Sequence, residues 1–311
     1  MSISTPISAF AAIIPVFGVI GIGFIAKRLK IVPDTSWGAV NSFGYWMLYP
    51  AFLFSTVASA DFSGPETMTF LGCLILGFTL AAGWGLLLRL FLKTDGPAFT
   101  SVFQGSVRWN GFVILAAAPA LYGPQGTALV ALGFGPVVAF VNIISVSVLA
   151  RWGDNKVEPT LFGALSEVGR NPLVLASIAG VIANLSGLLN VMGPVPDAVA
   201  LLGRAAMPIA LVSVGAALSF SELTKAPFLL TLGVVSKLMV APVLMLVVGM
   251  MLGLSPLLLA VAVGVSSMPS APASYVLARE MGGDAPLMAA IVTATTLLAL
   301  ITIPFWHSLT L

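Results

Sequence analysis

Apolar runs of roughly membrane-spanning length follow one another along almost the whole chain. A transmembrane helix needs about 20 mainly apolar residues, and inside a bilayer a helix satisfies its own backbone hydrogen bonds. The runs therefore predict an all-α polytopic membrane protein. We predict ten transmembrane helices, at residues 7–26, 40–58, 69–92, 98–121, 127–150, 172–189, 198–218, 227–252, 256–278 and 285–309.

The composition agrees with this fold class and argues against several functions. Hydrophobic residues make up 59% of the chain and charged residues 8%, with a mean hydropathy of +1.09, whereas soluble proteins carry about 25% charged residues. A net charge of +2 is too small to indicate nucleic-acid binding. The one cysteine, Cys73, and the one histidine, His307, offer neither an intrachain disulfide nor a metal cluster. We expect no cofactor, no bound metal and no enzyme activity.

The placement of Lys and Arg predicts the orientation. If ten helices span the membrane and the N-terminus lies outside, Arg204 falls on the outer side and Arg108 and Lys237 fall within helices. That leaves ten of the 13 basic residues on the inner side. Because basic loops favour the cytoplasm, we expect an integral protein of the plasma (inner) membrane with both termini outside.

The even number of spans divides into two halves of opposite orientation. A charged cytoplasmic linker, 151–171, separates residues 1–150 from residues 172–311, and each half contains five predicted helices. An offset of 158 residues between the halves also places Pro50 on Pro208. The pattern predicts two inverted five-helix repeats.

The fourth and ninth predicted helices are interrupted at matching positions. In the fourth, residues 107–111 run on to Pro119; in the ninth, residues 265–269 run on to Pro272. Proline removes a backbone donor and breaks the helical ladder, which lipid tolerates only where the freed groups face protein or a watery cavity. A symmetric pair of interrupted membrane helices is typical of a transporter binding site.

Four stretches, in chain order, resemble the auxin efflux carrier family. They are residues 41–54, residues 108–112 followed by Pro119 and 121–123, residues 207–216, and residues 268–274. The bacterial branch of that family includes proteins assigned to malonate and other carboxylates, so the resemblance implies transport of a small organic anion. It also implies a ten-helix fold like that of bile-acid symporters and sodium/proton antiporters.

The resemblance further implies two functional bodies. Residues 1–58 and 172–218 would form a scaffold, and residues 69–150 and 227–311 a transport domain in which the fourth and ninth helices cross at mid-membrane. The transport domain would move past the scaffold like an elevator and expose the site to each side in turn. A homodimer formed through the scaffold would suit such a movement.

One departure from the family pattern concerns the first break. In the family a glycine-proline-leucine-like segment often follows the asparagine closely, but here the proline after Asn110 comes only at Pro119. The break can therefore rest on Gly111 and its neighbours, with Pro119 ending the helix.

Half-helix N-termini that meet at a crossing offer unpaired N–H groups and partial positive charge, which suit a carboxylate. We predict that the Asn110 amide contacts the anion; the alternative is that Asn110 only caps unwound backbone. Arg108 lies within its helix and either attracts the anion or extends toward the cytoplasm. Ser267 and Ser270, beside the second break, either bind substrate or bond back to their own helix.

Further polar residues lie outside the two breaks. Tyr49 and Asn41 either line the path of the anion or act in packing, and Asn142 needs a partner near the crossing. Lys237 has no acidic partner in its apolar run, so we expect it to neutralise half-helix C-terminal dipoles, with direct coupling to transport as the alternative. We assign the structure of the crossing to Gly111, Pro119, Pro269, Pro50, Pro208, Lys237 and Asn142.

All eleven acidic residues fall in predicted loops or at helix ends. A carboxylate proton relay or a carboxylate sodium site is therefore not expected, and uniport or exchange of the anion is the simplest mechanism. A sodium-coupled organic-anion symporter of the bile-acid type remains the alternative, because carbonyls and hydroxyls also bind sodium. A channel built from the broken helices is a further alternative.

Overall fold

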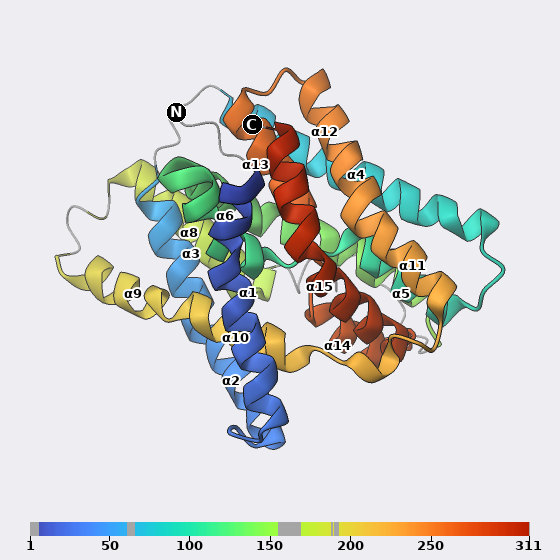
Figure 1. The fold of residues 1–311 in the computed structure, drawn as a ribbon. Helices are drawn as coiled ribbons and strands as arrows, with labels where there is room; N and C mark the ends of the chain where they lie inside the picture. Colours follow the sequence, from blue (N-terminus) through green and yellow to red (C-terminus); the bar gives the residue numbers. More distant parts are fainter. Residues whose placement is uncertain (1–5, 61–65, 155–168, 188, 190–192, 311) are drawn as a thin grey trace.

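The computed structural model describes residues 6–60, 66–154, 169–187, 189 and 193–310, and this part of the chain is helical (Figure 1). The α-helices are α1 (Pro6–Arg28), α2 (Trp37–Phe43), α3 (Tyr49–Ala58), α4 (Thr67–Phe91), α5 (Gly96–Val107), α6 (Gly111–Trp152), α8 (Pro172–Ser186), α9 (Val195–Arg204), α10 (Ala206–Ala217), α11 (Pro227–Val235), α12 (Ala241–Met251), α13 (Pro256–Ser266), α14 (Ala273–Glu280) and α15 (Ala285–Thr310). Two 3₁₀ turns, η1 (Asp34–Ser36) and η4 (Phe220–Glu222), and two π-helical segments, η2 (Gly44–Leu48) and η5 (Ser236–Val240), complete the list.

The structure confirms an all-helical polytopic membrane protein. Among the described residues, six helical stretches are long and apolar enough to cross a bilayer, and α8 and α13 are shorter apolar helices. The number is below the ten predicted because the predicted helices 98–121 and 127–150 join into one stretch, and because the predicted spans 172–189 and 256–278 contain the shorter helices α8 and α13. The predicted span 40–58 is not among the six, although it is helical from α2 through η2 to α3. The joined stretch, Gly96–Trp152, contains α5 and α6.

Helix α6 consists of two limbs. Gly123 has φ 67° and ψ −169°, a left-handed conformation that glycine adopts without strain. It separates a first limb, residues 111–122, from a second limb, residues 124–152. The loop predicted between the helices 98–121 and 127–150 is therefore replaced by a single residue, Gly123, with a positive φ angle.

Pro119 does not break the helix, contrary to the reading in which it interrupts the fourth span. It lies inside the first limb, and the chain is non-helical earlier, at residues 108–110. The break instead coincides with Asn110 and Gly111, where the Asn110 side chain caps the new helix and Gly111 opens it. An asparagine cap starts a helix at any position where the preceding backbone is extended.

Helices from the two halves of the chain pack against each other. Helix α1 contacts α10, α3 contacts α8 and α9, and α4 contacts α12. The α1–α10 contact is close because of glycine: a Cβ added to Gly215 would overlap the Ile20 carbonyl, and one added to Gly23 would overlap Val212. Small residues give membrane helices this backbone approach.

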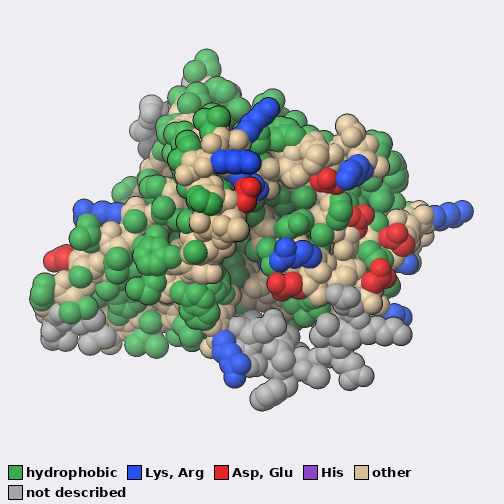
Figure 2. Space-filling view, turned by 90° about the horizontal axis from the view of Figure 1, so that it is seen from below, with side chains coloured by type: hydrophobic (Ala, Val, Ile, Leu, Met, Phe, Trp, Pro, Cys, Tyr) green, Lys and Arg blue, Asp and Glu red, His purple; other side chains and the backbone are tan. Residues whose placement is uncertain are grey.

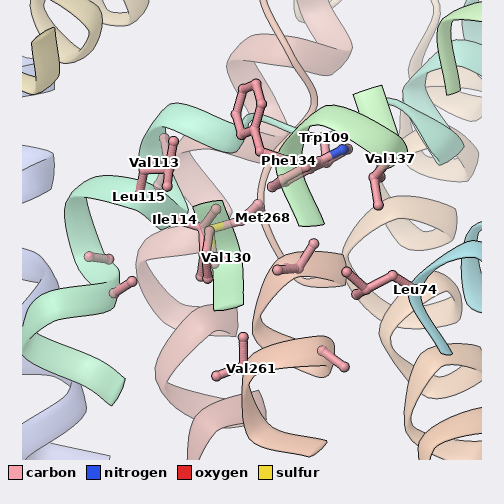
Figure 3. Close-up of a cluster of buried hydrophobic side chains, with 14 of the residues drawn as sticks. Leu74, Trp109, Val113, Ile114, Leu115, Val130, Phe134, Val137, Val261 and Met268 are labelled. Atoms are coloured by element: carbon pink, nitrogen blue, oxygen red, sulfur yellow. The ribbon is translucent and has the colours of Figure 1, made fainter. Parts of the chain in front are cut away.

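The core surrounds the two helix breaks (Figure 3). Trp109, from the first break, and Met268, from the second, belong to the same buried cluster. The centroid of the Trp109 ring lies 5.6 Å from that of the Phe134 ring and 6.1 Å from that of the Phe78 ring. Both interruptions of the helical ladder are therefore enclosed by protein, as a bilayer requires.

The beginning of α1 and the end of α15 lie toward the same end of the molecule (Figure 1). Lys and Arg side chains are spread over the opposite face, which Figure 2 shows from below. This face corresponds to the side predicted to be cytoplasmic; the orientation itself stays a prediction.

Candidate substrate site at two helix breaks

The two helix breaks touch. Between α5 and α6 the chain is non-helical at residues 108–110, and between α13 and α14 it is non-helical at residues 267–272. The Asn110 N–H donates to the Pro269 carbonyl across the breaks at 2.8 Å. The Ser270 hydroxyl donates to the Gly105 carbonyl on α5, also at 2.8 Å. Two segments separated by about half the chain are thus joined in the core by one backbone–backbone and one side chain–backbone hydrogen bond.

Asn110 has one satisfied and one unsatisfied side-chain group. The residue is 1% exposed, and its Oδ1 accepts from the Phe112 N–H at 3.2 Å, which caps α6. Its Nδ2 is buried with no hydrogen-bond partner among the described residues. The two roles considered for Asn110, capping and substrate contact, use different atoms and are compatible. A buried amide left without a partner costs about 1–3 kcal/mol.

Other buried donors near the first break also lack partners in the described part of the chain. They are Trp109 Nε1, beside Asn110, and Nε2 of Gln104, one turn earlier on α5. The Gln104 Oε1 acceptor and, after the second break, the Ser274 hydroxyl at the start of α14 are buried without described partners as well. None of these three residues was predicted from the sequence. Gln104 had one available signal, a polar residue four positions before Arg108 inside an apolar helix.

Arg108 and Asn142 are partners. The Arg108 Nη1 donates to Asn142 Oδ1 at 2.7 Å, which joins the first break to the second limb of α6. Asn142 therefore has the partner that the sequence analysis required. The guanidinium is held within the protein by this bond, and its Nε is buried without a described partner.

Lys237 is fully buried on η5, at 0% exposure. Its Nζ donates to the Ser266 carbonyl, the last residue of α13, at 3.1 Å, and lies 5.8 Å from the centroid of the Phe78 ring. A cation at a helix C-terminus is electrostatically favourable. This is the placement that dipole compensation requires, while the role itself stays a prediction.

The π-helical turn that carries Lys237 is held from both sides. Trp306 Nε1 donates to the Leu238 carbonyl at 2.8 Å, and Trp84 Nε1 donates to the Ser236 hydroxyl at 3.0 Å. A π-helical turn interrupts the regular i→i−4 ladder and recurs at functional sites. Two tryptophans therefore hydrogen-bond the residues on either side of Lys237 in the chain.

The predicted serines differ in what they bind. Ser267 Oγ donates to the Gly264 carbonyl of its own helix at 2.9 Å, which is the local alternative considered for it. Ser270 instead bridges to Gly105, and its N–H donates to Thr295 Oγ1 at 3.1 Å. Ser270 thus ties the two breaks and α15 together.

Of the two predicted residues on the second span, one reaches the crossing. The Tyr49 ring is buried, with its centroid 4.3 Å from that of Phe112, just after Asn110. Asn41 is exposed on α2 instead of buried beside the break. Pro50 is the second residue of α3.

An apolar cavity of about 320 Å³ lies beside the first limb of α6. Its lining comes from α1, α3, both limbs of α6, and α10: Pro15, Val16, Phe52, Thr56, Leu115, Ala116, Pro119, Thr127, Met207, Pro208 and Leu211. Pro119 and Pro208 therefore meet at one cavity, although neither forms a helix break.

Among the described residues, no Asp or Glu is buried, and no three His, Cys, Asp or Glu side chains gather as a metal site. The charged groups that the described core does enclose are cationic, on Lys237 and on the partly buried Arg108. The electrostatics around the crossing therefore favour an anion.

Comparison with known proteins finds similarity to membrane transporters. Residues 160–307 match the model of a family described as "Membrane transport protein". A Rhizobium meliloti protein named "Putative malonate transporter" is 28% identical over 304 residues, which cover 94% of this chain and 92% of that protein. An "Uncharacterized transporter" from Methanothermobacter thermautotrophicus is 24% identical over 293 residues, covering 92% and 93%.

Over residues 160–307 the chain therefore matches a membrane transport protein family, and it is similar to two transporters over almost its whole length. This match confirms the resemblance to auxin efflux carriers drawn from the four stretches. It also confirms a transporter and not an enzyme.

Proposed function

We propose that this protein is a secondary carrier that moves a small organic anion, a carboxylate, and that the anion binds where the two helix breaks touch. The observation that carries the proposal is the buried Nδ2 of Asn110, a donor without a described partner at the start of a half-helix. Backbone N–H groups and the helix dipole attract anions at such a terminus. The name of the Rhizobium relative supports a carboxylate.

The proposed architecture has ten spans in two inverted repeats, residues 1–150 and 172–311. The spans would be α1, α2–α3, α4, α5 with the first limb of α6, the second limb, α8, α9–α10, α11–α12, α13–α14 and α15. This grouping is supported by the backbone bond between the fourth and ninth spans. Residues 1–58 and 172–218 form the scaffold of this proposal, and residues 69–150 and 227–311 the transport domain, which moves as an elevator. Both termini lie outside, the membrane is the plasma (inner) membrane, and the scaffold is the natural surface for a homodimer.

The test compares two helix caps. Asn110→Ala removes the cap of α6 and the proposed substrate donor, whereas Asn171→Ala removes only a cap, since Asn171 Oδ1 accepts from Leu173 and Val174 N–H at the start of α8. Each cap loss costs about 1 kcal/mol of stability. We expect both variants to unfold at similar temperatures, with carboxylate affinity lowered about tenfold or more in Asn110→Ala alone.

The assay is carboxylate-evoked current and radiolabelled exchange in liposomes carrying the reconstituted protein, with and without sodium. Saturable transport at carrier rates supports the proposal, and channel-like flux would contradict it. Transport that requires sodium would replace uniport or exchange with the symporter mechanism. Unchanged affinity in Asn110→Ala would remove Asn110 from the site.

A further inference from the structure

A second group of unpartnered polar atoms lies on the other side of Arg108 from Asn110. Gln104 and Ser145 are both 0% exposed. Gln104 Oε1 and Nε2, Ser145 Oγ and Arg108 Nε are buried without hydrogen-bond partners among the described residues. Each orphaned group costs about 1–3 kcal/mol, so four atoms in one region indicate an absent ligand.

Helix α5 and the second limb of α6 pack as antiparallel neighbours, which places these residues together. At one end of the contact the Phe99 and Trp152 rings stand 5.4 Å apart between centroids. At the other end Arg108 donates to Asn142. Residue numbers rise along α5 as they fall along the second limb.

The register follows from the Arg108–Asn142 bond. Gln104 lies one turn before Arg108 on α5, and Ser145 lies one turn after Asn142 on the second limb. Residues three or four apart share a helix face. The step from Arg108 to Gln104 leads toward the N-terminus of α5, and the step from Asn142 to Ser145 leads toward the C-terminus of α6. Because the two helices are antiparallel, both steps lead in the same direction in space. Gln104 and Ser145 therefore lie at the same level, on the sides of the helices that face each other.

The chemistry of the group selects an anion. Arg108 carries a permanent positive charge, the Gln104 amide supplies two N–H donors, and the Ser145 hydroxyl supplies one. The described residues bury no carboxylate that would neutralise the guanidinium. A cation is disfavoured beside Arg108, whereas a carboxylate accepts charge-assisted hydrogen bonds from all three side chains.

We propose that Gln104, Arg108 and Ser145 hold a second carboxylate, so that the carrier selects dicarboxylates; this rests on the proposed function, in which Asn110 holds the first. Arg108 and Asn110 belong to extended backbone, with ψ 133° and ψ 92° respectively. Their Cα atoms are therefore at most about 7 Å apart. Donors on both sides of this short segment can engage the two ends of one small molecule.

The experiment measures dissociation constants of malonate, its monomethyl ester and acetate for the full chain in detergent or liposomes. The ester keeps the size of the diacid and loses one charge. We expect malonate to bind at least tenfold more tightly than the ester. Gln104→Met and Ser145→Ala should bring this ratio close to one and leave the ester affinity unchanged.

Ser106→Ala is the matched control. Ser106 is also a buried serine on α5, but its hydroxyl donates to the Val102 carbonyl of its own helix at 2.8 Å. The malonate-to-ester ratio should stay at the wild-type value in this variant. Ser145→Ala removes a single oxygen atom and provides the test if Gln104→Met unfolds the protein.

Two results would overturn the inference of a second carboxylate site without contradicting the proposed carrier function. One is equal wild-type affinity for malonate and its ester. The other is an unchanged ratio in Gln104→Met and Ser145→Ala, which would mean that water fills the group. Absence of binding for all three carboxylates would instead refute the proposed function, and this inference with it.

Discussion

Lys237→Met tests whether the buried lysine stabilises a half-helix. The Lys237 amine is bonded to the Ser266 carbonyl at the C-terminus of α13. Methionine keeps most of the length and apolar stem of the side chain and removes only the charged donor. Because Lys237 is 0% exposed, water does not replace the lost bond.

The expected loss is about 2 kcal/mol of unfolding free energy. A buried carbonyl left without its donor costs about 1–3 kcal/mol, and loss of a cation at a partly buried helix C-terminus costs up to about 2 kcal/mol. The apolar replacement recovers part of this loss, because no ammonium group has to leave water. At about 2–4 °C for each kcal/mol, the melting temperature should fall by about 4–8 °C.

The assay is thermal unfolding of the purified protein in detergent, with Lys27→Met as the control. Lys27 Nζ also donates to a carbonyl at a helix C-terminus, that of Ala216 on α10, at 2.7 Å. Lys27 is exposed, so water takes over its bond and the change should stay below about 1 kcal/mol. Substrate preference should be unchanged in both variants.

An unchanged or raised melting temperature in Lys237→Met would refute dipole compensation, because desolvation of the amine would then outweigh its bond. Normal stability together with lost or altered transport would instead assign Lys237 to coupling. Equal destabilisation in Lys237→Met and Lys27→Met would show that burial of the contact is irrelevant.

Two further predictions concern topology and packing. In a Cys73→Ser background, the exposed Asp154→Cys thiol should be labelled by a membrane-impermeant reagent only from the cytoplasmic side, and labelling of intact cells from outside would overturn the orientation. Gly215→Ala should cost about 2–3 kcal/mol, since its Cβ would overlap the Ile20 backbone. Gly21→Ala, with nothing within 4 Å, should leave the melting temperature within about 2 °C; equal melting temperatures for the two variants would contradict the packing.

Much of the fold could be predicted from the sequence because spanning a bilayer is a local requirement. The long helices α1, α4 and α15 begin and end close to the predicted apolar runs. The π-helical segments at residues 44–48 and 236–240 were not predicted. The length of an apolar run predicts that a segment is helical, whereas a π-helical turn depends on how neighbouring side chains pack.

The candidate site was only partly predictable. Asn110 and Gly111 marked the first break, because an asparagine cap and a glycine are local signals. Pro119 was a misleading signal, since proline lowers helix stability without always ending a helix in the membrane. Gln104 and Ser145 were missed because a polar residue in an apolar run indicates a buried partner without identifying it.

The sequence alone determined the all-helical membrane class, the positions of the interrupted helices and the resemblance to a transporter family. These follow from apolar length, from charge distribution and from motifs, all of which are properties of contiguous residues. Only the tertiary structure decided that Asn110 meets Pro269, that Arg108 holds Asn142 and that Lys237 caps α13. Such contacts join residues far apart in the chain, so they depend on the path of the whole backbone.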